Sequence, residues 1–276
     1  MKQTLADKIF DVINVILILI ITLFCTYPIY FALIASFSNE TAVGLGQTVF
    51  WIKDFTLSSY RIILNDSGFW RSYGLAIIYS GAGILFNLLI TIPTAYVLTK
   101  KHLPGRHYIN WFFLFTMYFE GGMIPTYITM NSLHLINKPI ILVLLGGMSI
   151  YNLLVTRIFL ESNVPEEIFE AARLDGASEF RQFTQIVLPL SKAVIAVMAL
   201  YYSVDRWNNY YNALVYLNDP DLMPLQVVLR NLLILNDKNH GLKYAVIFVS
   251  CAPLLVAYPF VQKYFTKGLL VGAVKS

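Results

Sequence analysis

Residues 11–37 form an apolar block that is longer than an ordinary core helix of a small soluble protein. Within this block residues 15–24 are interrupted only by Thr22, and the apolar character continues to Ala35. Because about 20 mostly apolar residues are enough for a helix to cross a bilayer, the block predicts a membrane-spanning helix. Its apolar part is longer than that of a cleaved signal peptide, and residues 36–41 lack a small-residue cleavage pattern. We therefore expect an uncleaved first span.

The composition extends this expectation to the rest of the chain. Of the 276 residues 57% are hydrophobic and 13% are charged, whereas roughly a quarter of the residues of a soluble domain are charged. The sequence therefore predicts an all-α, polytopic membrane protein, with a single domain over residues 1–276 and a core at about residues 72–264. Six blocks are long enough to span a bilayer, at residues 11–37, 72–99, 108–130, 139–160, 191–214 and 244–264.

Basic residues indicate the orientation of these spans. If both termini lie on one side, twelve of the 20 lysines and arginines fall on that side, and the short loop at residues 100–107 is especially basic. Short basic loops remain in the cytoplasm, so we expect both termini there. Cys25 and Cys251 lie inside apolar blocks and are predicted to be buried packing residues rather than partners in a disulfide.

Three segments are left for the outer side, at residues 38–71, 131–138 and 218–243. They are moderately charged and contain aromatic and apolar residues such as Phe50 and Trp51. Interfacial or re-entrant helices would have this composition, and so would a contact surface for an extracellular partner.

The loop between the fourth and fifth blocks, within residues 161–190, predicts two short helices joined by a tight turn. Ser162 or Asn163 can cap the first helix, Pro165 suits an early helical position, and Gly176 can take the positive φ that ends a helix. A modest apolar side of this helix is expected from Ile168, Ala171, Ala172 and Leu174.

The second helix is predicted to begin at Ser178 as its N-cap and to lead to Pro189 at the start of the fifth span. Phe180, Phe183 and Val187 are expected on one face of it. An amphipathic linker lying on the membrane surface would explain this pattern. Against that interpretation, the loop is acidic and carries small residues that permit close approach of a protein partner: Ala171, Ala172, Gly176 and Ala177.

The loop resembles the EAA loop of binding-protein-dependent ABC importer permeases. The resemblance lies in Glu-Ala-Ala at residues 170–172, Asp-Gly-Ala at 175–177 and Ile-Val-Leu-Pro at 186–189. It implies the type I ABC importer permease fold, with the first short helix as the coupling helix that docks on an ATPase. Glu170 would be the polar anchor of that helix. The implied docking residues are Glu170, Ala171, Ala172, Leu174, Asp175, Gly176 and Ala177. Ala193 departs from the family, where proline is common after Ser-Lys.

Three further stretches resemble the carbohydrate-uptake branch of this family, in its polysaccharide/lipoprotein-named subgroup, and the second permease of the maltose type. They are residues 119–127, 224–231 and 264–268. The resemblance implies a bacterial inner-membrane subunit that is not an enzyme and binds no metal. Its expected partners are a second homologous permease in a heterodimer, a dimeric ABC ATPase that holds ATP and Mg, an extracellular solute-binding protein, and a carbohydrate, in particular an oligosaccharide.

Ionisable residues inside membrane spans point to a substrate path, because they are costly there. Glu120 lies roughly 18 Å into the third block, and Asp205 and Arg206 lie about 20 Å beyond Lys192 in the fifth. Gly121 and Gly122 would let the helix deform beside Glu120. The path residues predicted from this polar and aromatic composition are Glu120, Tyr127, Asp205, Arg206, Trp207, Asn208, Asn209, Tyr211 and Asn212.

One other interpretation stays open for these residues. Glu120 and Arg206 would also suit a buried ion pair, with Trp207 and Tyr211 as anchors at the membrane interface. Our hypothesis is that both interpretations hold in part, with Arg206 tethered by Glu120 or Asp205; Arg206 also hints at an acidic saccharide.

Two other functions would suit a chain of this kind. One is a proton-coupled secondary transporter that uses Glu120 as its carrier, and the other is an intramembrane enzyme. The sequence contains neither a His-Glu-x-x-His pattern nor a phosphate-binding Gly-rich loop with Lys-Ser/Thr. Any ATP hydrolysis is therefore expected on a separate chain.

Overall fold

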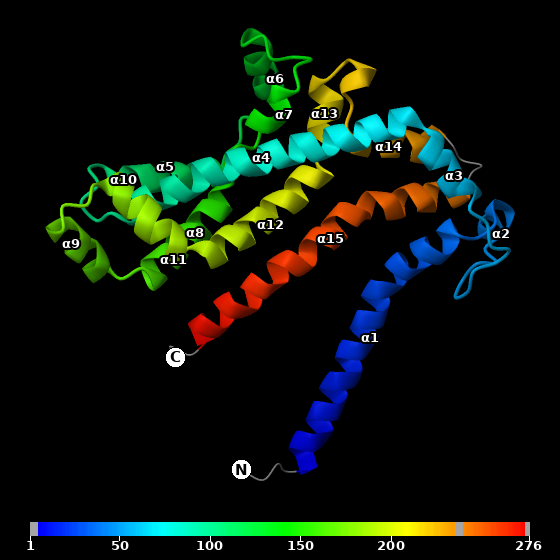
Figure 1. Ribbon diagram of the computed structural model, residues 1–276, viewed down its shortest axis with the longest axis horizontal. Coiled ribbons are helices and arrows are strands. Elements are labelled where there is room, and N and C mark those ends of the chain that lie inside the picture. The colour runs from blue at the N-terminus through cyan, green and yellow to red at the C-terminus, as the bar shows by residue number, and fades with distance from the viewer. Residues whose placement is uncertain (1–4, 236–239, 274–276) are drawn as a thin grey trace. The chain divides into compact units, whose positions relative to one another are not determined.

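A computed structural model describes residues 5–235 and 240–273, which are helical and contain no β-strand (Figure 1). Contacts divide the chain into two compact units. The first unit is Met1–Trp70 with Leu229–Ala252, and the second is Arg71–Val228 with Pro253–Ser276. Residues 236–239 of the predicted outer segment at 218–243 lie outside the described residues.

The first unit is built on α1 (Leu5–Ser36), whose large apolar side chains from Ile9 to Tyr30 are exposed, whereas Ala32, Ile34 and Ala35 near its end are buried. An exposed surface of this kind is stable in lipid, so α1 agrees with the predicted first span. The segment that follows forms α2 (Glu40–Gly44) and α3 (Ser58–Asn65). It folds back on itself through backbone hydrogen bonds, from Asn39 N to Lys53 O at 3.0 Å and from Thr56 N to Phe37 O at 2.9 Å.

The second unit contains the part of the chain that surrounds the predicted loop. Its long helix α4 (Ser67–Thr99) begins in the first unit and runs through the second without interruption. The other helices of this unit outside the loop are α5 (Arg106–Tyr118), α6 (Met123–Ser132), α7 (Ile140–Leu144), α8 (Ile150–Asn163), α12 (Lys192–Asn208) and α13 (Tyr211–Tyr216), followed by a 3-10 turn (Pro220–Leu222). The residues of α14 (Leu225–Leu235) and α15 (His240–Ala273) are divided between the two units.

Three described segments are long and apolar enough to cross a membrane as single helices: Asp7–Ser36, Ser67–Thr99 and His240–Pro259. A fourth is counted if Glu179–Leu190 and Lys192–Asn208, which meet at a bend of 78°, form one span. The predicted spans at residues 108–130, 139–160 and 191–214 are not single continuous helices in the structure. These blocks are interrupted at residues 119–122, 145–149 and 209–210. Two of the breaks contain a glycine with positive φ, Gly122 at 82° and Gly146 at 69°, which a regular helix cannot include.

The cysteines also differ from expectation. Cys25 and Cys251 are free thiols with exposed side chains rather than buried packing residues. Both lie on long apolar helices whose outward surfaces have no protein neighbours in this chain. An apolar sequence context therefore did not distinguish burial in protein from exposure on a membrane helix.

Candidate functional site

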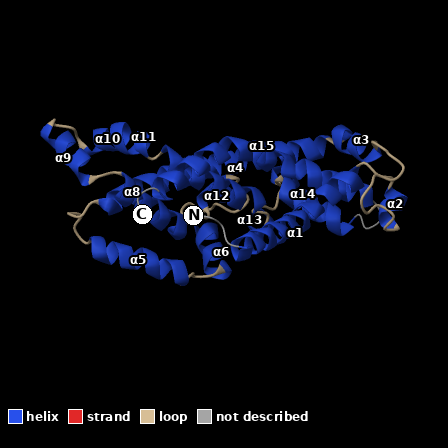
Figure 2. Ribbon diagram, turned by 90° about the horizontal axis from the view of Figure 1, so that it is seen from below, coloured by secondary structure: helices blue, strands red, loops and turns tan. Residues whose placement is uncertain are grey.

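The predicted loop between α8 and α12 forms one end of the second unit (Figure 2). Its first helix, α9 (Glu166–Leu174), begins directly after Pro165, which occupies the N-cap position without a side-chain hydrogen bond. The expectation that Ser162 or Asn163 caps α9 is wrong, because both residues belong to α8, and the Asn163 amide donates to the Phe159 carbonyl at 2.9 Å. Carboxylates in the first turn of α9 and a basic residue in its last turn complement the helix dipole.

A tight turn at Gly176 ends α9. Gly176 has φ +74°, its N–H donates to the Arg173 carbonyl at 3.0 Å, and the Ala177 N–H donates to the Ala172 carbonyl at 2.9 Å. A side chain at position 176 would be strained in this left-handed conformation. The predicted turn and the role of its glycine are confirmed.

The second helix begins as α10 (Glu179–Gln182), with Ser178 Oγ accepting from the Arg181 N–H at 3.3 Å, as predicted for the cap. It continues as a π-helical segment (Phe183–Val187) and α11 (Leu188–Leu190). The wider π turn changes which side chains share a face. Val187 is fully buried, whereas Phe180 is 77% exposed, so the prediction of one common face is wrong for Phe180.

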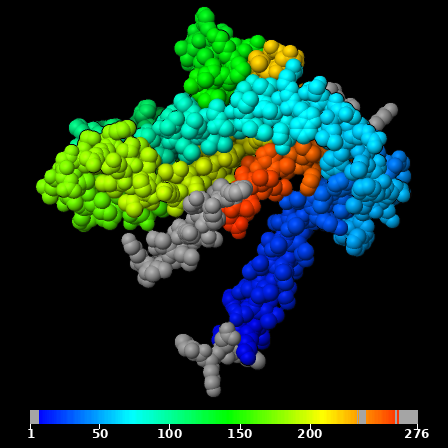
Figure 3. Space-filling view, in the orientation of Figure 1, coloured from blue at the N-terminus to red at the C-terminus, as the bar shows by residue number. Residues whose placement is uncertain are grey.

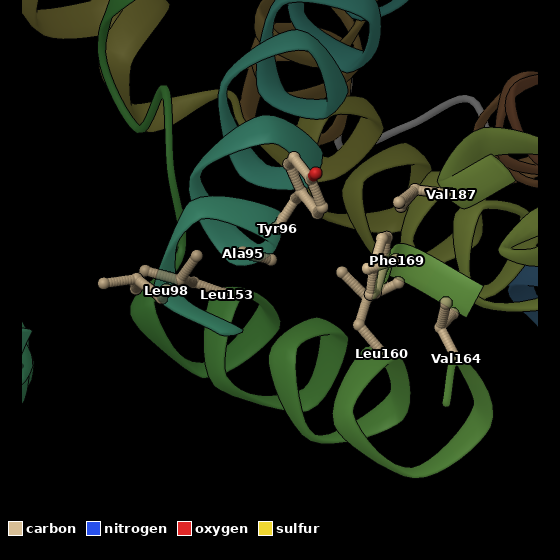
Figure 4. Close-up of a cluster of buried hydrophobic side chains, with 8 residues drawn as sticks. All are labelled: Ala95, Tyr96, Leu98, Leu153, Leu160, Val164, Phe169 and Val187. Atoms are coloured by element: carbon tan, nitrogen blue, oxygen red, sulfur yellow. The ribbon is translucent and has the colours of Figure 1, made fainter. Parts of the chain in front are cut away.

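The inner side of the loop packs on α4 and α8 (Figure 4). Phe169 of α9 and Val187 are buried against Tyr96 of α4 and Leu160 of α8. The buried cluster consists of Ala95, Tyr96, Leu98, Leu153, Leu160, Val164, Phe169 and Val187. Burial of these apolar side chains fixes the orientation of α9, because rotation of the helix would expose Phe169.

The outer side of the loop carries large apolar side chains among polar ones. Leu174 is 90% exposed and Ile168 is 39% exposed, beside the exposed Glu170 and Ala171. The predicted apolar side of α9 is therefore divided, since Ala172 is buried and the others face outward. Among the described residues no ion pair involves Glu170. Exposed apolar residues bordered by unpaired charge are typical of a protein contact surface.

Lys100, at the end of α4, joins both helices of the loop. Its Nζ lies 2.9 Å from Glu179 Oε2 and 4.4 Å from the ring centres of Tyr96 and Phe169. The Tyr96 hydroxyl donates to the same carboxylate at 2.7 Å. The hydrogen bond from Lys100 lowers the pKa of Glu179. Because this pKa is lowered in the folded protein, the contact is present at neutral pH and is lost as the pH falls through the folded-state pKa.

Two more ion pairs join residues 100–107 to this end of the unit. Lys101 Nζ lies 2.6 Å from Glu166 Oε2, and Arg106 Nη2 lies 2.7 Å from Glu161 Oε1. The hydrogen bond from Lys101 lowers the pKa of Glu166. These contacts surround a hollow of about 850 Å³ between the 100–107 loop, α8 and α9. The sequence predicted the basic loop only as a topology signal, and its contacts with the acidic loop were missed.

The predicted path residues of α12 separate onto two faces. Asp205 and Asn208 are exposed, whereas Arg206 and Trp207 are buried. Successive residues of a helix are about 100° apart, so neighbours in sequence cannot all face one path. Asn209 and Asn212 are half-buried in and after the break that follows α12, and Tyr211 is exposed.

The structure contradicts the predicted tether of Arg206. Its guanidinium donates to Asn87 Oδ1, from Nε at 3.0 Å and from Nη2 at 2.6 Å. It also donates to the carbonyls of Leu142 and Leu145, both at 2.7 Å, and of Gly146 at 2.9 Å. Neither Glu120 nor Asp205 forms an ion pair with it among the described contacts. Backbone carbonyls at the end of α7 and in the break after it, rather than a carboxylate, accept the hydrogen bonds of Arg206. Carbonyls at the end of a helix lack partners within the helix and are therefore available.

Glu120 lies in the break between α5 and α6 and is exposed. The predicted deformation beside it is confirmed, since no helix spans residues 119–122 and Gly122 has positive φ. Helix α6 then lies beside α13 (Figure 3). The Tyr127 ring stacks on Tyr216 with centres 5.8 Å apart, and the Tyr211 hydroxyl contacts Met123 Sδ at 2.8 Å.

Several helices that are long and apolar enough to cross a membrane, within one chain, define a multi-pass membrane protein. Residues 76–271 match the family described as "Binding-protein-dependent transport system inner membrane component". The chain belongs to this family and is an inner-membrane component of a transport system of that kind.

Several relatives cover almost the whole chain. Protein LplC of Bacillus subtilis (strain 168) is 37% identical over 289 residues, covering 100% of this chain and 98% of LplC. The polygalacturonan/rhamnogalacturonan transport system permease protein YtcP of the same strain is 33% identical, covering 98% and 99%. A subunit of a bacterial ABC transporter involved in the import of the acidic polysaccharide alginate has a similar crystal structure. Its TM-score is 0.88 at 31% identity, covering 96% of this chain and 99% of that chain.

Proposed function

We propose that this chain is the permease subunit of an ATP-driven ABC importer that takes up a carbohydrate delivered by an extracellular binding protein. The observation that carries the proposal is the loop at residues 161–190, with its fixed inner face and exposed outer face, in a chain of this family. Relatives named for polygalacturonan/rhamnogalacturonan and for arabinooligosaccharides support a carbohydrate, in particular an oligosaccharide.

The outer face of α9 is the proposed docking surface for the ATPase. Exposed Leu174 and Ile168 would enter an apolar groove on that partner, with Glu170 paired to a basic residue at its rim. The proposed docking residues are Glu170, Ala171, Ala172, Leu174, Asp175, Gly176 and Ala177. Of these, the buried Ala172 would act through packing rather than through contact.

The assembly requires chains beyond this one. A dimeric ATPase would hold ATP and Mg, and a second homologous permease would complete the path as a heterodimer. We propose that this chain contributes six spans with both termini in the cytoplasm. Three of these spans would be the interrupted segments α5–α6, α7–α8 and α12–α13. Interruptions at membrane depth are tolerated where they are covered by protein or line a wet cavity.

The exposed polar residues around these interruptions are the proposed substrate path. Asp205 and Asn208 on α12 and Glu120 in the α5–α6 break would accept or donate hydrogen bonds to sugar hydroxyls. Tyr127 and Tyr211 would offer ring faces to the apolar faces of a sugar, with Asn209 and Asn212 nearby. Arg206 and Trp207 would support this surface from behind, because both are buried. Arg206 therefore no longer indicates an acidic substrate.

The proposal is tested by uptake into liposomes that contain this chain with its partner permease, its ATPase and its binding protein. We expect uptake that depends on internal ATP and on the ATPase. Glu170→Lys should abolish uptake and ATPase association while membrane insertion is unchanged, because it reverses the charge at the docking face. Glu40→Lys on α2, outside the loop, is the charge control. Uptake that persists without ATP but requires a proton gradient would instead support a carrier that uses Glu120.

A further inference from the structure

Helix α4 contacts the segments on both sides of the loop at regular intervals along its length. Lys100 contacts α9 and α10 at one end of α4, and Thr91 and Asn87 contact α12 farther along the helix. The partners of Thr91 and Asn87 are Tyr202 and Arg206 of α12. Both pairs are spaced by four residues, so α4 and α12 lie side by side and antiparallel over about one helical turn.

The middle contact is a buried hydroxyl pair. Tyr202 OH lies 2.7 Å from Thr91 Oγ1 and accepts from the Ser149 N–H, the N-cap of α8, at 3.2 Å. Tyr202 is 2% exposed and Thr91 is fully buried. One phenol therefore joins α4, α8 and α12, and moving it would leave buried polar groups without partners.

The contact farthest from the loop is made by the guanidinium of Arg206. It is 6% exposed and donates to carbonyls from Leu142 to Gly146, which lie at the end of α7 and in the break before α8. Asn87 completes the arrangement, because its Nδ2 donates to the Gly146 carbonyl at 2.9 Å while its Oδ1 accepts from Arg206. A positive charge at the carbonyl end of a helix is favourable, so Arg206 stabilises this end of α7.

Glycine at position 83 of α4 leaves space for the Arg206 side chain. A Cβ atom on Gly83 would lie 2.9 Å from both Cδ and Nε of Arg206, which is too close for real atoms. A Cβ on Gly81, two residues earlier on the same helix, would meet no atom within 4 Å. The close approach of α4 to the arginine is therefore specific to one position.

We propose that Arg206 is a positioning residue that fixes the α7–α8 break to α4 and α12, so that movement of the loop at the other end of α8 and α12 reaches the substrate path. This inference rests on the proposed function. The loop leaves α8 at Asn163 and enters α12 at Lys192, whereas Arg206 joins the opposite ends of these two helices. With Lys100 at one end and Arg206 at the other, α4, α8 and α12 move as one body.

The test measures ATP hydrolysed per substrate molecule imported by the reconstituted transporter. Gly83→Ala displaces Arg206 without removing it, and Gly81→Ala is the matched control on the same helix. We expect Gly83→Ala to keep its ATPase activity and to raise the ATP-to-substrate ratio roughly 2- to 30-fold, in the range of mutations that alter coupling between sites. Gly81→Ala should retain the wild-type ratio.

Arg206→Lys provides the second variant. Lysine keeps the charge but has three donors on one atom in place of the planar fork, so an intermediate ratio is expected. A role in folding alone would lower uptake and ATPase activity together through loss of assembled complex, and would leave the ratio unchanged. The inference is overturned if assembled Gly83→Ala and Arg206→Lys complexes keep the wild-type ratio, or if neither variant assembles. Failure of the wild-type complex to show ATP-dependent uptake would refute the proposed function instead.

Discussion

Replacement of Lys100 with methionine tests whether α4 fixes the orientation of the loop. Methionine keeps the apolar stem against Tyr96 and Phe169 but removes the ammonium that lies 4.4 Å from both rings and 2.9 Å from Glu179. The side chain of Lys100 is only 19% exposed, so its contacts are partly shielded from water and salt. The change should therefore loosen α9 and α10 without opening the cluster beneath them.

The size of the effect follows from these contacts. A cation over an aromatic ring contributes about 0.5–1 kcal/mol at exposed sites and about 2 kcal/mol when desolvated. The ion pair contributes about 0.2–1 kcal/mol, at the low end here because the Glu179 side chain is 62% exposed. With the cost of desolvating Lys100, the net loss should be about 1–3 kcal/mol. If this energy maintains the docking-competent orientation, affinity for the ATPase should fall by up to about 5- to 150-fold.

The assay is titration of purified ATPase against this chain in nanodiscs, with Lys101→Met as the control. Lys101 is adjacent, carries the same charge and forms an ion pair with Glu166, but its side chain is 69% exposed and contacts no ring among the described interactions. The control should bind almost as wild type does, and its small loss should disappear at high salt. Equal affinities of the two variants would refute the argument that Lys100 organises the loop.

Two further substitutions test single contacts of the same unit. Gly176→Ala places a side chain at φ +74°, which costs about 1–2 kcal/mol, and should weaken ATPase binding while insertion stays normal. Gly46→Ala is its control, because Gly46 has a similar φ of +70° but lies outside the loop; unchanged binding of Gly176→Ala would contradict the role of the turn. Tyr202→Phe removes the hydroxyl between Thr91 and Ser149 and should cost about 1–3 kcal/mol because buried polar groups lose a partner. Thermal unfolding in detergent measures this loss against Tyr201→Phe, an exposed neighbour.

Local rules predicted much of the loop, because its determinants are close in sequence. The turn at Gly176 and the cap at Ser178 depend on residues that are neighbours along the chain. The predicted end of the second helix at Pro189 is wrong, because Pro189 lies within α11, which continues to Leu190. The prediction of the α9 cap is wrong because α8 extends to Asn163, three residues beyond the expected boundary at residue 160, and so includes both candidate cap residues. The π segment was not predicted, since its apolar spacing also suits an α-helix.

The interior of the unit could not be predicted in the same way. Arg206 lies 119 residues from Asn87 in sequence, and its other partners are backbone carbonyls, which every residue possesses. The sequence therefore showed that a costly charge must have partners, but not which ones. Adjacent glycines at 146–147 offered a local signal for the α7–α8 break. Within a long apolar block such a signal does not by itself predict a break, because apolar periodicity alone does not detect an interruption.

The distribution of continuous and interrupted helices suggests where the second unit deforms. Helix α4 is continuous, whereas α8 and α12 each end in a break on the side away from the loop. At ~1.5 Å per residue α8 is about 21 Å long and α12 about 25 Å long. Because the two lengths are similar, the same tilt would displace the far ends of both helices by similar distances. Hydrogen bonds to α4 keep these two helices together, and Arg206 holds the α7–α8 break against them. Of the two breaks, the one at residues 209–210 is therefore where we expect bending. Asp205 and Asn208 lie on α12 directly before one of these breaks. On the proposed coupling, movement of the loop would therefore reach the exposed polar face at this break.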